Sequence, residues 1–159
     1  NFNELVMLMP AADSARAQIA ASQQEAQDTY KSMTDEFQVK YQQYQQKSST
    51  WTPAIRESKE KELQDIQTRI QDFDQSIQQE LQQQQQQLMA PIQQRAVAAV
   101  EKLAKEGGYI YVFEKASMLY VDETQSVDLT PAARKALNIP DGRTLETLQQ
   151  ELQAQSQQK

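Results

Sequence analysis

The residues of this 159-residue chain whose types and spacing could do chemistry are three neighbouring carboxylates, Asp122, Glu123 and Asp128. Carboxylate oxygens bind Ca²⁺ when they follow one another in a dense loop that surrounds the ion. The segment lacks such a loop. A solvated acidic edge therefore accounts for these residues better than a calcium site.

Catalytic side chains are also scarce elsewhere. The chain has no Cys and no His, which removes the usual thiol nucleophile, the commonest general base and a common metal ligand. It has no glycine-rich phosphate loop and no metal-ligand spacing. We predict a protein that is not an enzyme and that uses no cofactor and no metal.

The composition indicates an extended or oligomeric molecule. Hydrophobic residues make up 38% of the chain, and the mean hydropathy is −0.80, so a single copy cannot bury a large core. The net charge is −6, the signs are dispersed and there is no basic stripe, which argues against nucleic-acid binding. No apolar run approaches the roughly 20 residues that span a bilayer. We expect no integral membrane segment and leave peripheral membrane contact open.

Most of the chain predicts long helices. Residues 1–106 contain no glycine and are rich in Gln, Glu, Lys and Ala, which favour helix. Pro53 divides this stretch, with Thr52 placed to cap the second helix and Pro53 at its first position. We predict an antiparallel helical hairpin, the arm, over 11–104, with its tip at 48–54.

The arm has one thin apolar stripe that repeats every eleven residues, which indicates nearly straight or slightly right-handed packing of the two helices. Two such series are Ser22, Met33, Tyr44, Ile55 and Ile66, Ile77, Leu88, Ala99. The stripe either only closes the hairpin or also leaves apolar side chains partly exposed for unfolded clients. The candidate contacts are Tyr30, Met33, Phe37, Tyr41, Tyr44, Trp51 and Phe73.

Pro91 lies inside the helical pattern. Proline removes one helix hydrogen bond and kinks a helix about one turn before its own position. We predict a hinge there, where the arm meets the rest of the chain.

After Gly107, placed to end the helix in a left-handed conformation, the pattern changes to β. The runs 109–113 and 118–122 are β-branched and aromatic and predict an antiparallel hairpin. Two strands alone are marginal, so further strands must come from the N-terminus or another copy of the chain. The predicted body or oligomer core contains Leu5, Ile110, Val112, Phe113, Leu119, Val121 and Leu129.

The fold class we predict is therefore α+β. A small β body from 1–10 and 105–137, completed by oligomerisation, bears the helical arm. Within it, a short helix begins with Thr130 as its cap and Pro131 as its first residue. The remaining residues, 138–159, form a helical and polar extension that either packs on the body or frays.

Several short motifs resemble the Skp/OmpH family of periplasmic chaperones. They match in order and spacing over about 1–137: Asn1-Phe2-Asn3-Glu4-Leu5, Met9-Pro10, Thr52-Pro53, Lys61-Glu62-Leu63-Gln64, Pro91-Ile92, Ala99-Val100, Glu106-Gly107-Gly108-Tyr109 and Asp128-Leu129-Thr130.

This resemblance implies a "jellyfish" homotrimer in the periplasm, with its signal peptide removed. Its strands would build a small body, and three helical arms would hold unfolded outer-membrane proteins without ATP. The chain departs from the family in three ways. In the family a strand precedes the equivalent of Asn1; it is not among these residues, so we expect that it was cut off or that the N-terminus is incomplete. The charge is acidic where the best-known members are basic, and 138–159 continues past the usual end.

Two other protein classes remain open. One is a structural or adaptor coiled-coil protein that binds a fixed helical partner, for which a well-filled apolar seam would be typical. The other is a cytosolic hairpin chaperone that resembles prefoldin subunits. A signal peptide upstream of Asn1 would favour the periplasmic holdase.

Overall fold

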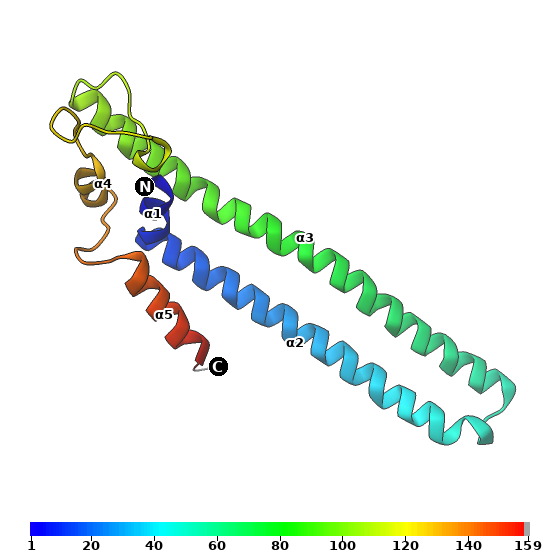
Figure 1. The fold of residues 1–159 in the computed structure, drawn as a ribbon. Helices are drawn as coiled ribbons and strands as arrows, with labels where there is room; N and C mark the ends of the chain where they lie inside the picture. The colour runs from blue at the N-terminus through cyan, green and yellow to red at the C-terminus, as the bar shows by residue number, and fades with distance from the viewer. Residues whose placement is uncertain (158–159) are drawn as a thin grey trace. The chain divides into compact units, whose positions relative to one another are not determined.

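The computed structural model describes residues 1–157, and the regular elements of those residues are helical (Figure 1). They are α1 (Phe2–Leu8), α2 (Pro10–Lys47), a 3₁₀ turn (Ser48–Thr50), α3 (Pro53–Glu106), a second 3₁₀ turn (Lys115–Ser117), α4 (Thr130–Ala136) and α5 (Leu145–Gln157). The chain divides into two compact units. One is Gln18–Gln85, and the other comprises Asn1–Ala17 with the chain from Gln86 onward.

The unit Gln18–Gln85 is a hairpin in which α2 and α3 lie side by side and run antiparallel (Figure 1). At about 1.5 Å per residue, the 38 residues of α2 span roughly 57 Å. Pro53 is the first residue of α3, and the Thr52 hydroxyl accepts a hydrogen bond from the Ile55 amide at 3.4 Å. The predicted cap and first position of the second helix are both confirmed.

The seam of this hairpin is thin. Among the described residues of Gln18–Gln85, Ile66 is the one fully buried hydrophobic side chain, 2% exposed. Other apolar seam residues are half-buried: Met33, Phe37, Tyr44, Leu63, Ile70, Phe73, Ile77 and Leu81. The hairpin therefore buries little apolar surface for its length.

Helix α3 continues through Pro91 without interruption, and the two units divide between Gln85 and Gln86. The helix ends in a Schellman motif. The Tyr109 amide donates to the Ala104 carbonyl at 2.9 Å, and the Gly108 amide donates to the Lys105 carbonyl at 3.2 Å. The left-handed residue is Gly108, with φ 71°, so the prediction of Gly107 for this role is wrong by one position.

The second unit contains the larger core. The Asn1 side chain caps α1 by accepting from the Glu4 amide at 3.3 Å, and α2 starts at Pro10, which has no amide hydrogen to continue α1. Helix α1 contacts α4 and α5. The buried cluster is Leu5, Val6, Leu8, Met9, Ala12, Ala15, Ile92, Ala96, Ala133, Leu137, Ile139 and Leu148.

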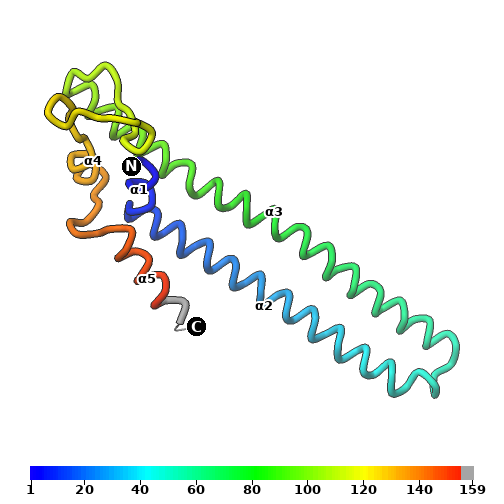
Figure 2. The backbone as a smooth tube through the Cα atoms, viewed as in Figure 1, coloured from blue at the N-terminus to red at the C-terminus, as the bar shows by residue number. Residues whose placement is uncertain are grey.

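The β-hairpin predicted at 109–113 and 118–122 is not formed, because residues 1–157 include no β-strand. These segments are irregular backbone on either side of the turn Lys115–Ser117, drawn in Figure 2 as a loop after α3. A strand needs a hydrogen-bonded neighbour, and an isolated two-stranded ribbon is marginal in water. The N-terminal segment cannot supply that neighbour here, because it is helical. The α+β prediction is therefore wrong for the single chain.

As far as the structure describes it, the end of the chain packs against the core and does not fray. Helix α4 starts at Thr130, with Leu129 at the cap position and Pro131 in the first turn, so the prediction of Thr130 as the cap and Pro131 as the first residue is wrong by one position. Helix α5 follows, and its Leu148 is buried in the core cluster. The last two residues of the predicted extension, 158–159, lie outside the described residues.

Candidate functional site

The aromatic and apolar side chains selected on the arm fall into two groups. Tyr30 and Tyr41 are 43% and 44% exposed. The others are half-buried: Met33, Phe37, Tyr44, Trp51 and Phe73. The hairpin thus leaves part of each of these side chains accessible.

Two ring contacts order this surface. Phe37 and Tyr41, one helical turn apart, stack with centroids 5.9 Å apart and planes at 9°. At the tip, Tyr44 and Trp51 meet edge to face, with centroids 5.9 Å apart and planes at 62°. Such pairs favour defined ring positions. Trp51 is therefore held against α2 rather than projecting freely.

Polar contacts link the two helices along the same stretch. The Tyr44 hydroxyl donates to the Glu60 carboxylate, which raises the pKa of Tyr44. Farther from the tip, the side-chain amide of Gln84 donates a hydrogen bond to the Ser22 hydroxyl at 2.8 Å. These bonds fix the register of the hairpin where apolar packing is sparse.

Ion pairs cross the middle of the arm. The Glu62 carboxylate accepts from Lys40 on α2 and from Lys59 on α3, the latter at 2.8 Å. Beside it, Arg69 pairs with Glu36 across the hairpin at 3.3 Å. The hydrogen bond from Lys40, followed by that from Lys59, lowers the pKa of Glu62 to about 2. The same contact raises the pKa of Lys40.

The second unit exposes several apolar side chains within 109–127. Ile110 is 86% exposed and Leu119 is fully exposed. Tyr111 and Phe113 contact each other, with centroids 5.9 Å apart, and are also largely exposed. An exposed apolar surface of this kind is typical of an interaction site.

The predicted body residues are placed unequally in the single chain. Leu5 is buried in the core, and Val121 and Leu129 are half-buried. Ile110, Val112, Phe113 and Leu119 are exposed. That all seven predicted body residues share one core therefore stays a prediction, and it concerns an assembly of several copies of the chain.

The carboxylates of the acidic edge each accept a hydrogen bond from the chain. Glu123 pairs with Lys115 at 2.7 Å, and Asp122 accepts from the Thr124 hydroxyl at 2.6 Å and the Thr124 amide at 2.9 Å. Asp128 accepts from the Thr130 amide at 2.9 Å. These contacts lower the pKa of Asp122 and of Glu123. The Thr130 side chain, followed by the Thr130 amide, lowers the pKa of Asp128. Among residues 1–157, no group of three or more His, Cys, Asp or Glu is arranged to hold a metal ion.

The ion pairs across the arm were not predicted from the sequence. Charged residues are frequent on both helices, and which of them face each other depends on the hairpin register. The Thr52-Pro53 signal fixes where α3 begins, so counting outward from it would have brought 40 and 62 close together.

Comparison with known proteins identifies the family of this chain. No helix within 1–157 is long and apolar enough to cross a membrane. The comparison with curated proteins found no match. Residues 1–137 match the family model described as "Outer membrane protein (OmpH-like)". That match covers most of the chain, and the chain belongs to the OmpH-like (Skp-like) family.

Proposed function

We propose that this protein is an ATP-independent holdase that binds unfolded outer-membrane proteins along its helical arm and prevents their aggregation. The family to which it belongs is not enzymatic. The observation that supports the proposal most is the thin seam of the arm. Tyr30 and Tyr41 remain more than 40% exposed on a hairpin with one fully buried apolar residue among those described.

Weak, repeated contacts suit this activity. An unfolded outer-membrane protein presents many apolar side chains, and several weak contacts made at once give useful avidity while each one exchanges quickly. The candidate contacts are Tyr30, Met33, Phe37, Tyr41, Tyr44, Trp51 and Phe73. A well-filled seam, as in an adaptor with a fixed helical partner, would leave these side chains buried.

The proposal includes a homotrimer. The segments 109–113 and 118–122 would pair as strands with those of other copies, and 1–10 and 105–137 would form the body that bears the arms. The exposure of Ile110, Phe113 and Leu119 supports this, because an exposed apolar surface on a chain this polar needs a cover. Pro91 would act as the hinge between arm and body.

The proposed setting is the periplasm, where outer-membrane proteins pass in unfolded form. Neither a nucleotide nor a metal has a role in the proposed activity. The net charge of −6 gives no general attraction to acidic clients or anionic lipid, so apolar contact has to provide the affinity.

An arm-deletion variant tests the function. Residues 31–76 are replaced by a short Gly-Ser turn, and light scattering follows the aggregation of a urea-diluted outer-membrane β-barrel protein. The variant should keep the mass of the intact oligomer and lose the ability to keep the client soluble. Full holding by the armless variant would overturn the proposal.

A matched pair of triple variants separates apolar contact from arm length. Tyr30→Ala, Phe37→Ala and Tyr41→Ala together should weaken holding. The control changes three exposed glutamines on the same helix, Gln27→Ala, Gln38→Ala and Gln42→Ala, and should hold normally. Equal holding by both would place the client elsewhere.

A further inference from the structure

The family match ends at residue 137. The residues that follow begin with a turn that terminates α4. Helix α4 ends in a Schellman motif. The Ile139 amide donates to the Arg134 carbonyl at 2.9 Å, and the Asn138 amide donates to the Lys135 carbonyl at 3.1 Å. Asn138 takes the left-handed position with φ 55°, and Ile139 is buried in the core. Asparagine tolerates this conformation better than other non-glycine residues, so the sequence specifies the turn.

The loop that follows is held from α4. The Arg134 guanidinium donates to the Pro140 carbonyl at 3.2 Å and to the Arg143 carbonyl. Gly142 has φ 77°, which glycine adopts without strain. The loop therefore has one defined path from α4 to α5.

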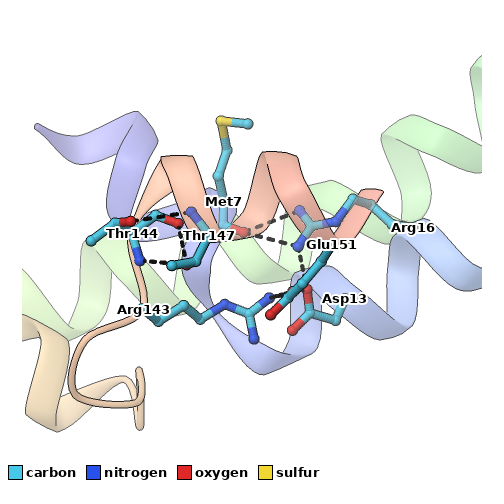
Figure 3. Close-up of polar contacts among 7 residues, drawn as sticks. All are labelled: Met7, Asp13, Arg16, Arg143, Thr144, Thr147 and Glu151. Atoms are coloured by element: carbon cyan, nitrogen blue, oxygen red, sulfur yellow. Dashed lines mark hydrogen bonds and ion pairs between the residues drawn. The ribbon is translucent and has the colours of Figure 1, made fainter. Parts of the chain in front are cut away.

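The start of α5 is capped from both directions. The Thr147 amide donates to the Thr144 hydroxyl at 3.2 Å, and the Thr144 amide donates to the Thr147 hydroxyl at 2.9 Å (Figure 3). This reciprocal pattern is that of a capping box, which satisfies two amides that would otherwise lack partners. A frayed polar tail has no need of such a cap.

An arginine then joins α5 to the beginning of the chain. Arg143 pairs with Asp13 on α2 at 2.6 Å and with Glu151 on α5 at 3.7 Å. Asp13 also pairs with Arg16, whose guanidinium donates twice to the Met7 carbonyl near the end of α1 at 3.1 Å (Figure 3). This set of contacts, which we call the Arg143 cluster, links α1, α2 and α5.

The apolar part of this attachment is small. Leu148 is 3% exposed and belongs to the core, and α5 contacts α1. Leu145 and Leu152, on the same face of α5, remain about 40% exposed. An isolated helix of 13 residues is marginal in water. Leu148 and the Arg143 cluster are therefore principal attachments of α5.

We propose that residues 143–157 form a salt-sensitive strap that closes over the apolar face of α1 and opens locally, without unfolding of the rest of its unit. Segments with few buried contacts open at a lower free energy than the global unfolding reaction. Asp13 and Glu151 are 37% and 56% exposed, so dissolved salt screens their attraction to Arg143. Opening uncovers part of the surface formed by Leu5, Leu8 and their neighbours.

Hydrogen exchange on the intact chain tests the strap directly. At about 0.05 M NaCl the amides of Leu148 to Glu151 should be protected, and at about 0.5 M NaCl they should exchange faster, together with those of Leu5 and Leu8. The amides around Ile92 and Ala96 on α3 should stay slow at both salt concentrations. Exchange of α5 at the rate of an unfolded chain in low salt would overturn the proposal. The proposal would also be overturned if the amides of α1, α5 and α3 exchange only together, in one common unfolding step.

Two matched pairs of variants locate the fastening points. Leu148→Ala should speed exchange of the α1 amides by roughly tenfold or more, whereas Leu152→Ala, on the exposed part of the same face, should change it little. Arg143→Gln should abolish most of the salt dependence of α5 exchange, and Arg95→Gln, at an exposed arginine of α3, should preserve it.

Slow α3 amides in each variant verify that the unit is folded. If Leu148→Ala leaves α1 protection unchanged, or if Arg143→Gln leaves the salt dependence intact, the strap does not exist as proposed. The exchange data on the unmodified chain remain decisive where a variant fails to fold.

Discussion

The Glu62 carboxylate accepts hydrogen bonds from one lysine on each helix of the arm. Lys40 reaches it from α2, and Lys59 reaches it from the preceding turn of α3. The hydrogen bond from Lys40, followed by that from Lys59, lowers the pKa of this carboxyl group to about 2. In a hairpin with so little apolar seam, such contacts contribute to the choice of register between the helices.

Glu62→Gln should therefore destabilise the arm modestly. The side chain is 34% exposed, so solvent screening limits the expected loss to about 0.5–1 kcal/mol of unfolding free energy at pH 7. The folded-state pKa is lowered, so this contribution is present above the ordinary carboxyl pKa near 4.5 and is lost as the pH falls through about 2. Urea unfolding of both proteins between pH 7 and pH 2 measures it.

Glu80→Gln, at an exposed position of α3, is the control. It should change the unfolding free energy little at any pH. If the difference between Glu62→Gln and the unmodified chain persists undiminished at pH 2, the ion pairs are not its source.

Single residues were predictable where the signal was local. Thr52 and Pro53 were placed correctly because a cap and a first-turn proline depend only on their neighbours in sequence. The left-handed glycine was missed by one position, because Gly107 and Gly108 are adjacent and either could end the helix. The Arg143–Asp13 contact joins residues 130 positions apart, and no local pattern indicates it.

At the scale of elements, the long helices follow from composition, and the β segments do not form from pattern alone. Gln, Glu, Lys and Ala make helix wherever no residue breaks the ladder, so 53–106 is one helix. The runs 109–113 and 118–122 have strand composition but no strand in the described single chain. Strand formation depends on a neighbouring strand, and the sequence of one copy does not contain that information.

Pro91 lies inside α3 and interrupts its ladder of hydrogen bonds. Proline inside a helix lacks the amide that would bond to the Gln87 carbonyl and is unfavourable by up to about 3 kcal/mol. Pro91→Ala should therefore raise the unfolding free energy by about 1–3 kcal/mol. Gln93→Ala, an exposed site on the same helix, should have little effect.

The same variant tests the proposed hinge. Because the chain has no Cys, one introduced cysteine on each side of Pro91 can carry a spin label. Pro91→Ala should narrow the distribution of distances between the labels. An unchanged distribution would remove the hinge and leave Pro91 as a local weakness of α3.

At the scale of the whole molecule, the exposed apolar surface of 109–127 concerns assembly. Ile110→Asp should leave the helical unit folded, since the side chain is 86% exposed in the single chain, but should dissociate the oligomer. Ile55→Asp, at an exposed isoleucine on the arm, should leave the oligomer intact. Sedimentation velocity compares the two variants, and an oligomer that survives Ile110→Asp would exclude this surface from the interface.

The central claim is that several copies assemble and together hold an unfolded client. Light scattering on a sizing column measures it most directly, with the protein alone and with a urea-diluted outer-membrane β-barrel protein. We expect the mass of three chains and co-elution of soluble client with that trimer. A monomer or dimer that leaves the client to aggregate would contradict it and would favour an adaptor with a fixed helical partner.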